Sequence, residues 1–187
     1  AVDDARQRPD SLGGWFAVVA PAVPPGGGSH VHWDKRLDAR LGAAMLSIQA
    51  VKGVAIGDGI DVSAGGGREA HDPIGYDPSV RRFTRPTNRA GGIEGGMTNG
   101  EIVRLRAYLK PLATLPEPLP SVDLVTKERS VAEVERTDTV PIVAAGVVGE
   151  AMAALVLADA MLEKFGGDSL RETRTNLDAY VQNLGEY

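Results

Sequence analysis

The sequence predicts an α+β fold in which helices pack on an antiparallel sheet. Three observations favour it: a short β-rich segment at residues 12–23, alternation of apolar and polar residues at 102–109, and a long Ala-, Leu- and Val-rich stretch at 145–165. Because strands precede helices without regular alternation, a doubly wound parallel sheet is disfavoured. With 187 residues of ordinary globular composition, we expect a single domain over residues 1–187.

The first part of the chain predicts a strand, a helix and a second strand. Residues 12–23 form the first strand, which the Pro- and Gly-rich run at 24–28 closes. Apolar residues then recur at helical spacing behind Asp34, which we expect to be the N-cap of an amphipathic helix. The positions of its apolar face are Leu37, Leu41, Ala44, Met45 and Ile48. Val51–Ile56 follows as a strand that Gly57 ends.

Residues 57–101 are rich in glycine and lack apolar periodicity, so we interpret them as one long loop region. Loops of this length inside a domain are usually functional or disordered. Residues 102–109 then predict a half-buried strand that ends at Pro111. Segments 121–125 and 130–134, separated by four residues, predict a β-hairpin.

The last third of the sequence predicts two helices. The first covers residues 145–165 and ends at the Gly pair 166–167, where we expect a left-handed stop. Either Asp168 or Ser169 caps the second helix, and Ser169 with Glu172 has the capping-box spacing. The apolar stripe of this helix, which we expect to pack against the rest of the molecule, consists of Leu170, Leu177, Val181 and Leu184.

Two sequence features bear on location. The apolar run at 140–162 is interrupted by Glu150 and Asp159, which are costly at a bilayer centre, so we expect a buried helix rather than a membrane span. The first ten residues lack the pattern of a signal peptide and a starting Met, so we expect processing or a preceding segment. A cytoplasmic location is the simplest interpretation.

Composition excludes several classes of protein and site. The chain has 20 Lys and Arg against 25 Asp and Glu, and only 5% aromatic residues, so a broad nucleic-acid-binding surface is excluded. The absence of cysteine excludes disulfides, thiolate metal sites and a cysteine nucleophile. We expect no metal site, because the candidate ligands lack metal-binding spacing. These are His30, His32, Asp34, His71 and Asp72.

The most unusual segment is residues 87–101, TNRAGGIEGGMTNGE, which contains two Gly pairs flanked by Asn and Thr. Glycine lets backbone N–H groups approach an anion closely, and Asn and Thr side chains add donors. The segment is neither a P-loop nor a dinucleotide-binding fingerprint. From its residues alone, both a loop that faces a phosphate or cofactor and a flexible connection remain open.

Charged residues supply two further candidate sites. Four arginines suit a small, multiply charged anion, although a solvated and mobile loop has the same pattern: Arg81, Arg82, Arg85 and Arg89. Lys110 precedes two backbone amides and the Thr114 hydroxyl. Asp138 follows Arg136 closely, where it can cap the long helix, pair with Arg136 or act as a base.

Taken together and in this order, five segments resemble the C-terminal half of chorismate synthases. They are residues 48–59 (IQAVKGVAIGDG), 87–101, 110–115 (KPLATL), 135–152 (ERTDTVPIVAAGVVGEAM) and 154–173 (ALVLADAMLEKFGGDSLRET). The form KFGGDSL, with AAGVV upstream, is most similar to actinobacterial members. The resemblance implies about one half of the family's β-α-β sandwich, in which helices lie between two antiparallel four-stranded sheets.

The resemblance also implies an activity. Family members are lyases that remove phosphate from 5-enolpyruvylshikimate 3-phosphate by a 1,4-anti elimination, which gives chorismate for aromatic amino-acid biosynthesis. They require reduced FMN without net redox change. Bacterial relatives mostly take reduced flavin from elsewhere, whereas some fungal ones reduce it with NADPH. Homotetramers are usual in the family.

Site residues follow from the same resemblance. The positions that match family contacts to FMN are Gln49, Ala50, Gly95, Lys110, Pro111, Leu112, Ala113, Thr114 and Arg136. Asp138 matches the acid assigned to proton transfer at flavin N5. Lys110 and Arg136 are the cations that a flavin phosphate and an anionic substrate need. We also expect the arginines at 81–89 to belong to a mobile flap over these ligands.

The chain departs from the family pattern in one important respect. The N-terminal motifs of the family, with both catalytic histidines, have no counterpart in this sequence. We therefore expect the isolated chain to be inactive and to expose helix faces that dimerisation or a swapped pairing would cover. The alternative is a non-catalytic module that binds FMN or another anion, or serves assembly, and retains the half-domain fold.

Overall fold

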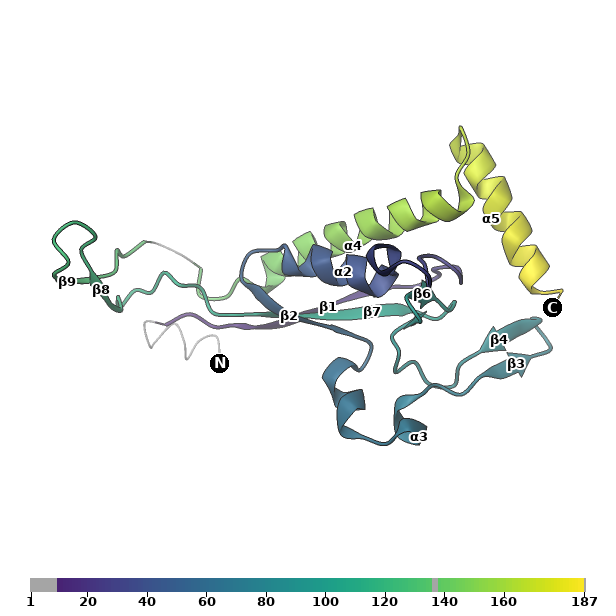
Figure 1. Cartoon of the computed structure of the whole chain (residues 1–187), viewed down its shortest axis with the longest axis horizontal. Coiled ribbons are helices and arrows are strands. Elements are labelled where there is room, and N and C mark those ends of the chain that lie inside the picture. Colours follow the sequence, from purple (N-terminus) through teal and green to yellow (C-terminus); the bar gives the residue numbers. More distant parts are fainter. Residues whose placement is uncertain (1–9, 136–137, 187) are drawn as a thin grey trace.

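The computed structural model describes residues 10–135 and 138–186, and its centre is a three-stranded antiparallel sheet (Figure 1). Strand β7 (Val103–Leu109) lies between β1 (Gly14–Ala20) and β2 (Val51–Ile56). The α+β prediction is confirmed, and all three expected strands form. Because β7 pairs along its full length with β1 and also with β2, it holds the two earlier strands together.

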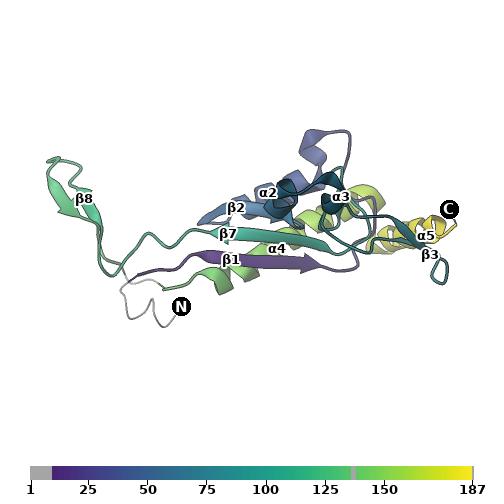
Figure 2. The ribbon, with the colours of Figure 1, turned by 90° about the horizontal axis from the view of Figure 1, so that it is seen from below.

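Both central helices pack on one face of this sheet, as the two views show (Figures 1 and 2). They are α2 (Leu37–Leu46) and α4 (Ile142–Phe165). Alternate residues of β7 are buried, so one face of the strand joins the core and the other does not. The largest fully buried side chains come from α2 and β7: Leu37, Leu41, Met45, Leu105 and Val103.

Small residues let α4 approach the sheet closely. Ala145, Gly149 and Ala153 recur every four residues on its buried face. A Cβ atom at Gly149 would lie 2.3 Å from Cε2 of Phe16 on β1, so the helix backbone and the ring are in direct contact there. The sequence spacing of these small residues therefore sets the distance between helix and sheet.

The opposite side of α4 is exposed, which corrects the expectation of a buried helix. Val143 is 81% exposed and Leu155 is 67% exposed. Within the described residues only the sheet-facing side of the helix is covered, and the other side is one of the exposed helix faces that the family resemblance implies. By length and composition alone, α4 would suffice to cross a membrane. One of its two polar interruptions, Asp159, forms an ion pair with Arg40 of α2.

The start of α2 differs from the prediction. Asp34 lies in a 3-10 turn, η1 (Trp33–Lys35), and the N-cap of α2 is Arg36, whose guanidinium pairs with Asp38 at 2.6 Å. Asp34 as N-cap was therefore wrong. The first helical N–H, that of Leu37, donates to the Gly96 carbonyl at 2.8 Å, so a distant loop satisfies the helix end instead of a side-chain cap.

The end of α4 also differs. Gly166 has an extended ψ of −176° and a φ of −42°, so the left-handed stop was wrong. The Asn176 amide closes the helix end, because its Nδ2 donates to the carbonyls of Phe165 and Gly166 at 3.1 and 2.8 Å. Glycine is needed at 166, since a Cβ there would lie 2.5 Å from the Leu162 carbonyl oxygen.

Helix α5 (Leu170–Leu184) begins as predicted, with Ser169 as its N-cap. The Ser169 hydroxyl accepts from the Glu172 N–H at 3.3 Å, and the Glu172 carboxylate accepts from the Asp168 N–H at 2.7 Å. The predicted packing of its apolar stripe is present only in part, because Leu177 and Leu184 are half-buried whereas Leu170 and Val181 are exposed. The helix runs from the end of α4 toward the turn of the β3–β4 hairpin (Figure 1).

The Gly-rich region between β2 and β7 contains several short elements instead of one loop. They are η2 (Gly59–Ala64), α3 (Gly67–Ala70), β3 (Gly75–Asp77), β4 (Arg82–Thr84), β5 (Ile93–Glu94) and β6 (Met97–Thr98). Strands β3 and β4 pair with each other, as do β5 and β6. The region therefore consists of small hairpins and turns, of which α3 and the β3–β4 hairpin lie apart from the central sheet (Figure 1).

A hairpin of β8 (Pro120–Val122) and β9 (Arg129–Val131) projects beyond the end of the sheet (Figures 1 and 2). The predicted hairpin is present, but its connection covers residues 123–128 and is longer than expected. Asp123 explains the difference, because its carboxylate and backbone close a wider turn.

Two glycines of α4 give a matched test of the close contact. We expect Gly149→Ala to lower the free energy of unfolding by about 1–3 kcal/mol, because the new methyl overlaps the Phe16 ring. At Gly146 a Cβ would lie no closer than 3.8 Å to Phe16, so Gly146→Ala should raise stability by about 0.5–1 kcal/mol through helix propensity. Urea unfolding measures both, and equal effects would contradict the packing argument.

Candidate functional site

The turn between α2 and β2 meets the segment that follows β7 at one end of the sheet. The Lys110 N–H donates to the Ala50 carbonyl at 2.9 Å. Ala50 has a φ of +67°, which is uncommon for a residue other than glycine and is maintained by its surroundings. Residues 49–50 and 110–114, which are more than fifty positions apart in the sequence, therefore lie side by side.

A third part of the chain joins the same end. The buried Ser11 hydroxyl donates to the Leu112 carbonyl at 2.8 Å. The neighbouring Leu12 N–H donates to the Thr139 carbonyl, also at 2.8 Å. Asp138 precedes Thr139 directly, so the structure brings this predicted acid to the end of the sheet where Lys110 lies.

The polar side chains of this end face solvent. Gln49, Lys110 and Asp138 are exposed, whereas Leu112 and Thr114 are half-buried. An exposed ammonium next to an exposed carboxamide and a hydroxyl can bind a phosphate, and an exposed carboxylate can accept a proton from a bound molecule. Arg136, the other predicted cation, lies outside the described residues.

Gly95 lies elsewhere. It forms the β5–β6 turn with Gly96, and both have positive φ, +61° and +89°, which only glycine adopts easily in such a turn. Gly96 accepts from Leu37 at the start of α2, whereas Ala50 follows the end of that helix. Ten helical residues span about 15 Å, so one chain does not bring Gly95 together with Lys110.

The Gly-rich motif at 87–101 is braced by its own side chains. Asn88 donates to the Ile102 carbonyl at 2.8 Å and accepts from the Gly92 N–H at 2.7 Å. The buried Thr98 hydroxyl donates to the Pro24 carbonyl at 2.7 Å. These Asn and Thr groups therefore hold the loop through hydrogen bonds within the chain.

Asp72 is the main support of this loop. The side chain is buried and accepts from the Thr87 hydroxyl at 2.6 Å and from the N–H groups of Arg89 and Ala90 at 2.8 and 2.9 Å. Burial acts to raise the pKa of the Asp72 carboxyl, but the hydrogen bonds from Thr87, Ala90 and Arg89 outweigh it, so its pKa lies below the usual value. The sequence indicated Asp72 only as an unlikely metal ligand.

The arginines near this loop serve the fold. Arg85 forms an ion pair with Glu94 at 2.7 Å, and Arg82 and Arg89 each donate to a backbone carbonyl. Protein oxygens therefore engage three of the guanidiniums that the sequence suggested for a small anion.

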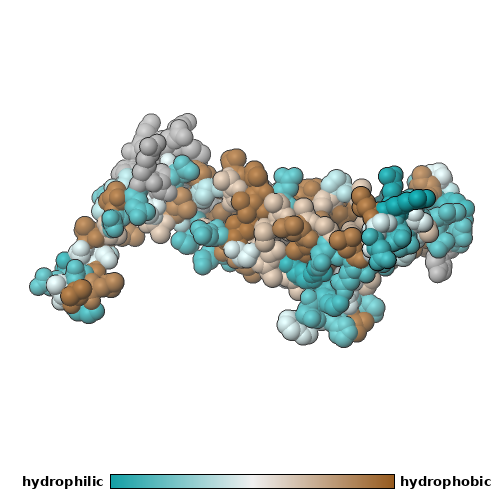
Figure 3. Space-filling model, turned by 90° about the horizontal axis from the view of Figure 1, so that it is seen from above, coloured by the Kyte–Doolittle hydropathy of each residue, from teal (hydrophilic) through white to brown (hydrophobic). Residues whose placement is uncertain are grey.

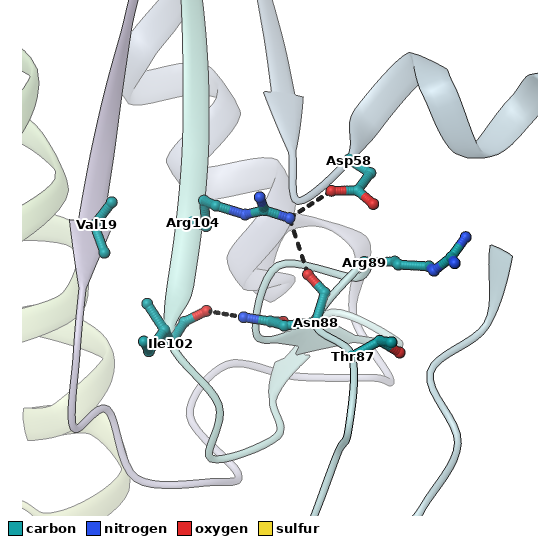
Figure 4. Close-up of a pocket in the computed structure, with 7 residues that line it drawn as sticks. All are labelled: Val19, Asp58, Thr87, Asn88, Arg89, Ile102 and Arg104. Atoms are coloured by element: carbon teal, nitrogen blue, oxygen red, sulfur yellow. Dashed lines mark hydrogen bonds and ion pairs between the residues drawn. The ribbon is translucent and has the colours of Figure 1, made fainter. Parts of the chain in front are cut away.

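A cavity of about 640 Å³ opens on the face of the sheet away from α2 and α4 (Figure 4). Arg104 of β7 reaches across it to the Asp58 carboxylate and to the Asn88 carbonyl, the latter at 3.0 Å. Sequence reasoning missed this site, although the polar positions of the alternating 102–109 segment indicate which side chains face away from the core. The lining residues are Val19, Asp58, Thr87, Asn88, Arg89, Ile102 and Arg104.

The histidine candidates form no metal centre in the part of the chain that the structure describes, where no group of three or more potential ligands gathers. The His30 Nδ1 atom lies 3.3 Å from the sulfur of Met97.

Comparison with known proteins decides the family. The family model described as chorismate synthase matches residues 1–162. The chain belongs to the chorismate synthase family. The chorismate synthase of Solibacter usitatus is 55% identical over 186 residues, which are 100% of this chain and 48% of that protein. The chorismate synthase of a Nocardioides species is 54% identical over 184 residues, covering 98% of this chain and 46% of that protein.

A solved chorismate synthase structure has the same fold. It superposes with a TM-score of 0.83 at 40% identity, and the match covers 100% of this chain and 48% of that one. The family resemblance and the half-sandwich fold inferred from the sequence are thus confirmed. The chain spans about half the length of the chorismate synthases it matches.

Because the Asp72 carboxylate accepts the hydrogen bonds that hold this loop, we expect the free energy of unfolding to depend on pH. The folded pKa is below that of an unfolded Asp, about 3.9, so the carboxylate stabilises the fold above about pH 4 and loses this effect as the pH falls through the folded pKa. We expect Asp72→Asn to cost about 1–3 kcal/mol at pH 7 and progressively less below pH 4.

Urea midpoints of the wild type and of Asp72→Asn at pH 7 and at pH 3 measure this difference. Asp61→Asn, an exposed site in η2, is the control for loss of one negative charge. A stability difference for Asp72→Asn that stays the same at both pH values would show that the loop does not depend on the charged carboxylate.

Proposed function

We propose that this chain carries part of the FMN site of a chorismate synthase. The complete enzyme would convert 5-enolpyruvylshikimate 3-phosphate to chorismate by a 1,4-anti elimination of phosphate. One observation carries the proposal: segments 49–50 and 110–114, which match family FMN contacts, meet at one end of the sheet beside Asp138.

The residues at this end fit a flavin phosphate chemically. Lys110 offers an exposed ammonium, Gln49 an exposed carboxamide and Thr114 a hydroxyl. A phosphate prefers such donors, and the bond from a cationic donor is the strongest of them. Lys110, Gln49 and Thr114 would hold the cofactor, together with Ala50, Pro111, Leu112, Ala113 and Arg136.

When bound, reduced FMN would supply the electron density that assists departure of the phosphate. Asp138 is an exposed carboxylate next to Thr139, whose carbonyl is held by Leu12. We assign to Asp138 the task of accepting a proton at the flavin and of returning it. Gly95 lies at the other end of α2, so its contact to FMN would come from another copy or from a rearranged loop.

The exposed side of α4 supports a larger active molecule. Val143, Val147 and Leu155 form an apolar surface that a soluble enzyme covers. We propose that the remaining length of a chorismate synthase packs on it, with the substrate-binding and histidine motifs that this sequence lacks. A cytoplasmic homotetramer is the assembly that we propose for the complete enzyme.

The alternative is a non-catalytic module that binds FMN or another anion. Such a module would have the same binding site at Lys110 as the enzyme fragment, but it would not catalyse the reaction when the missing half is supplied. Reconstitution with the N-terminal half of a related chorismate synthase separates the two, because only the enzyme fragment would restore chorismate formation.

An FMN titration of the 187-residue chain tests the site. We expect saturable quenching of flavin fluorescence that Lys110→Ala weakens about 10- to 100-fold, because one charge-assisted hydrogen bond is lost. Lys52→Ala, which removes an exposed lysine from β2, should leave the affinity unchanged. Repeating the titration with 5-enolpyruvylshikimate 3-phosphate tests whether substrate strengthens flavin binding.

Two results would contradict the assignment. Equal loss of affinity in Lys110→Ala and Lys52→Ala would mean that FMN responds to net charge alone. Absence of binding by a chain that shows cooperative unfolding would mean that this half holds no flavin by itself.

A further inference from the structure

The β8–β9 hairpin is fully exposed. All six residues of its two strands are exposed, and the hairpin lies beyond the end of the sheet in both views (Figures 1 and 2). Hydrophobic surface is visible on it in Figure 3, at the far left of the molecule. Leu124 and Val125 at its tip are 81% and 88% exposed. An isolated two-stranded hairpin is marginally stable in water, so such a surface suits a partner.

The tip of the hairpin is pre-organised. The Asp123 carboxylate accepts from the N–H groups of Val125 and Thr126 at 2.8 and 2.7 Å. The Asp123 N–H donates to the Glu128 carbonyl at 3.0 Å. A tip held in one conformation loses little entropy when it docks, which favours binding.

The register separates the hairpin into two different faces. Pro120 pairs with Val131, and Val122 pairs with Arg129, so these four side chains share one face. Ser121 and Ser130 pair on the other face. The first face is apolar with one cation and the second carries serine hydroxyls.

On the apolar face, Val131 lies between a cation and an anion, Arg129 and Glu133, each two residues away. The Ala132 N–H donates to the Leu119 carbonyl at 2.9 Å, so the ladder continues past Val131 and alternation places Glu133 on the side of Arg129. Arg129 and Glu133 are about 13 Å apart along one extended strand, too far for an ion pair within it. Along the strand, this face therefore presents a cation (Arg129), an apolar residue (Val131) and an anion (Glu133).

We propose that the apolar face of this hairpin docks on the same face of a second copy of this chain, antiparallel about a two-fold axis at Val131. In that arrangement Arg129 of each copy lies opposite Glu133 of the other, and the valines meet between the two ion pairs. When a second copy runs antiparallel, its anion lies opposite the cation of the first copy and its cation opposite the anion. The face is therefore complementary to itself, as a two-fold interface requires. This charge complementarity selects a second copy over an unrelated partner.

The size of the surface sets the expected strength. Residues 119–134 are fewer than the 20–30 per side of a standard stable interface. We therefore expect a weak dimer, with a dissociation constant in the range of about 1–100 μM. The inference does not depend on the proposed flavin site.

Sedimentation velocity of the 187-residue chain between about 1 and 300 μM tests the docking. We expect Arg129→Glu and Glu133→Arg each to weaken the dimer about tenfold, because like charges then face each other twice. The double variant restores opposite charges and should return the dissociation constant to within about threefold of the wild type. Ser130→Glu, on the serine face, is the control and should change little.

Several outcomes would overturn the proposal. One is a wild-type chain that stays monomeric over the whole range. Another is self-association whose dissociation constant neither single variant changes. This result would indicate that the copies associate through the apolar side of α4 instead of the hairpin. A double variant as weak as the singles would also exclude the antiparallel pairing. Because the substituted residues are exposed, unchanged urea midpoints confirm that the variants fold.

Discussion

The double pairing of β7 organises most of the molecule. Its backbone bonds to β1 on one side and to β2 on the other, so strands from distant parts of the sequence are aligned by one seven-residue segment. The side chains of its buried face belong to the same hydrophobic core as those of α2 and α4. The end of the strand then delivers Lys110 to the carbonyl of Ala50. The core and the candidate flavin site thus depend on the same backbone register.

Helix α4 has one closely packed side and one exposed side. Its small residues lie on the sheet side, where Gly149 contacts Phe16, and its larger apolar residues lie on the other side. This arrangement suits a helix between two layers. It agrees with a chain that spans about half of the chorismate synthases it matches.

The loop between β2 and β7 illustrates how polar residues can serve structure instead of chemistry. Asp72, Asn88 and Thr98 each satisfy backbone groups of a glycine-rich segment. A loop that buries backbone amides needs such partners, because an unpaired amide is costly. The same residue types would also suit anion binding, and their contacts here assign them to bracing the loop.

The sequence by itself determined the strands at 14–20, 51–56 and 103–109, both long helices and the family, because periodicity and motif order are local properties of the chain. It determined the N-cap of α5, which is local, but not the groups that close the start of α2 and the end of α4, because distant residues supply them: Gly96 for α2 and Asn176 for α4. Only the tertiary structure showed which side of α4 is covered and that Gly95 lies apart from Lys110. Both depend on contacts between segments far apart in the chain, which local patterns do not encode.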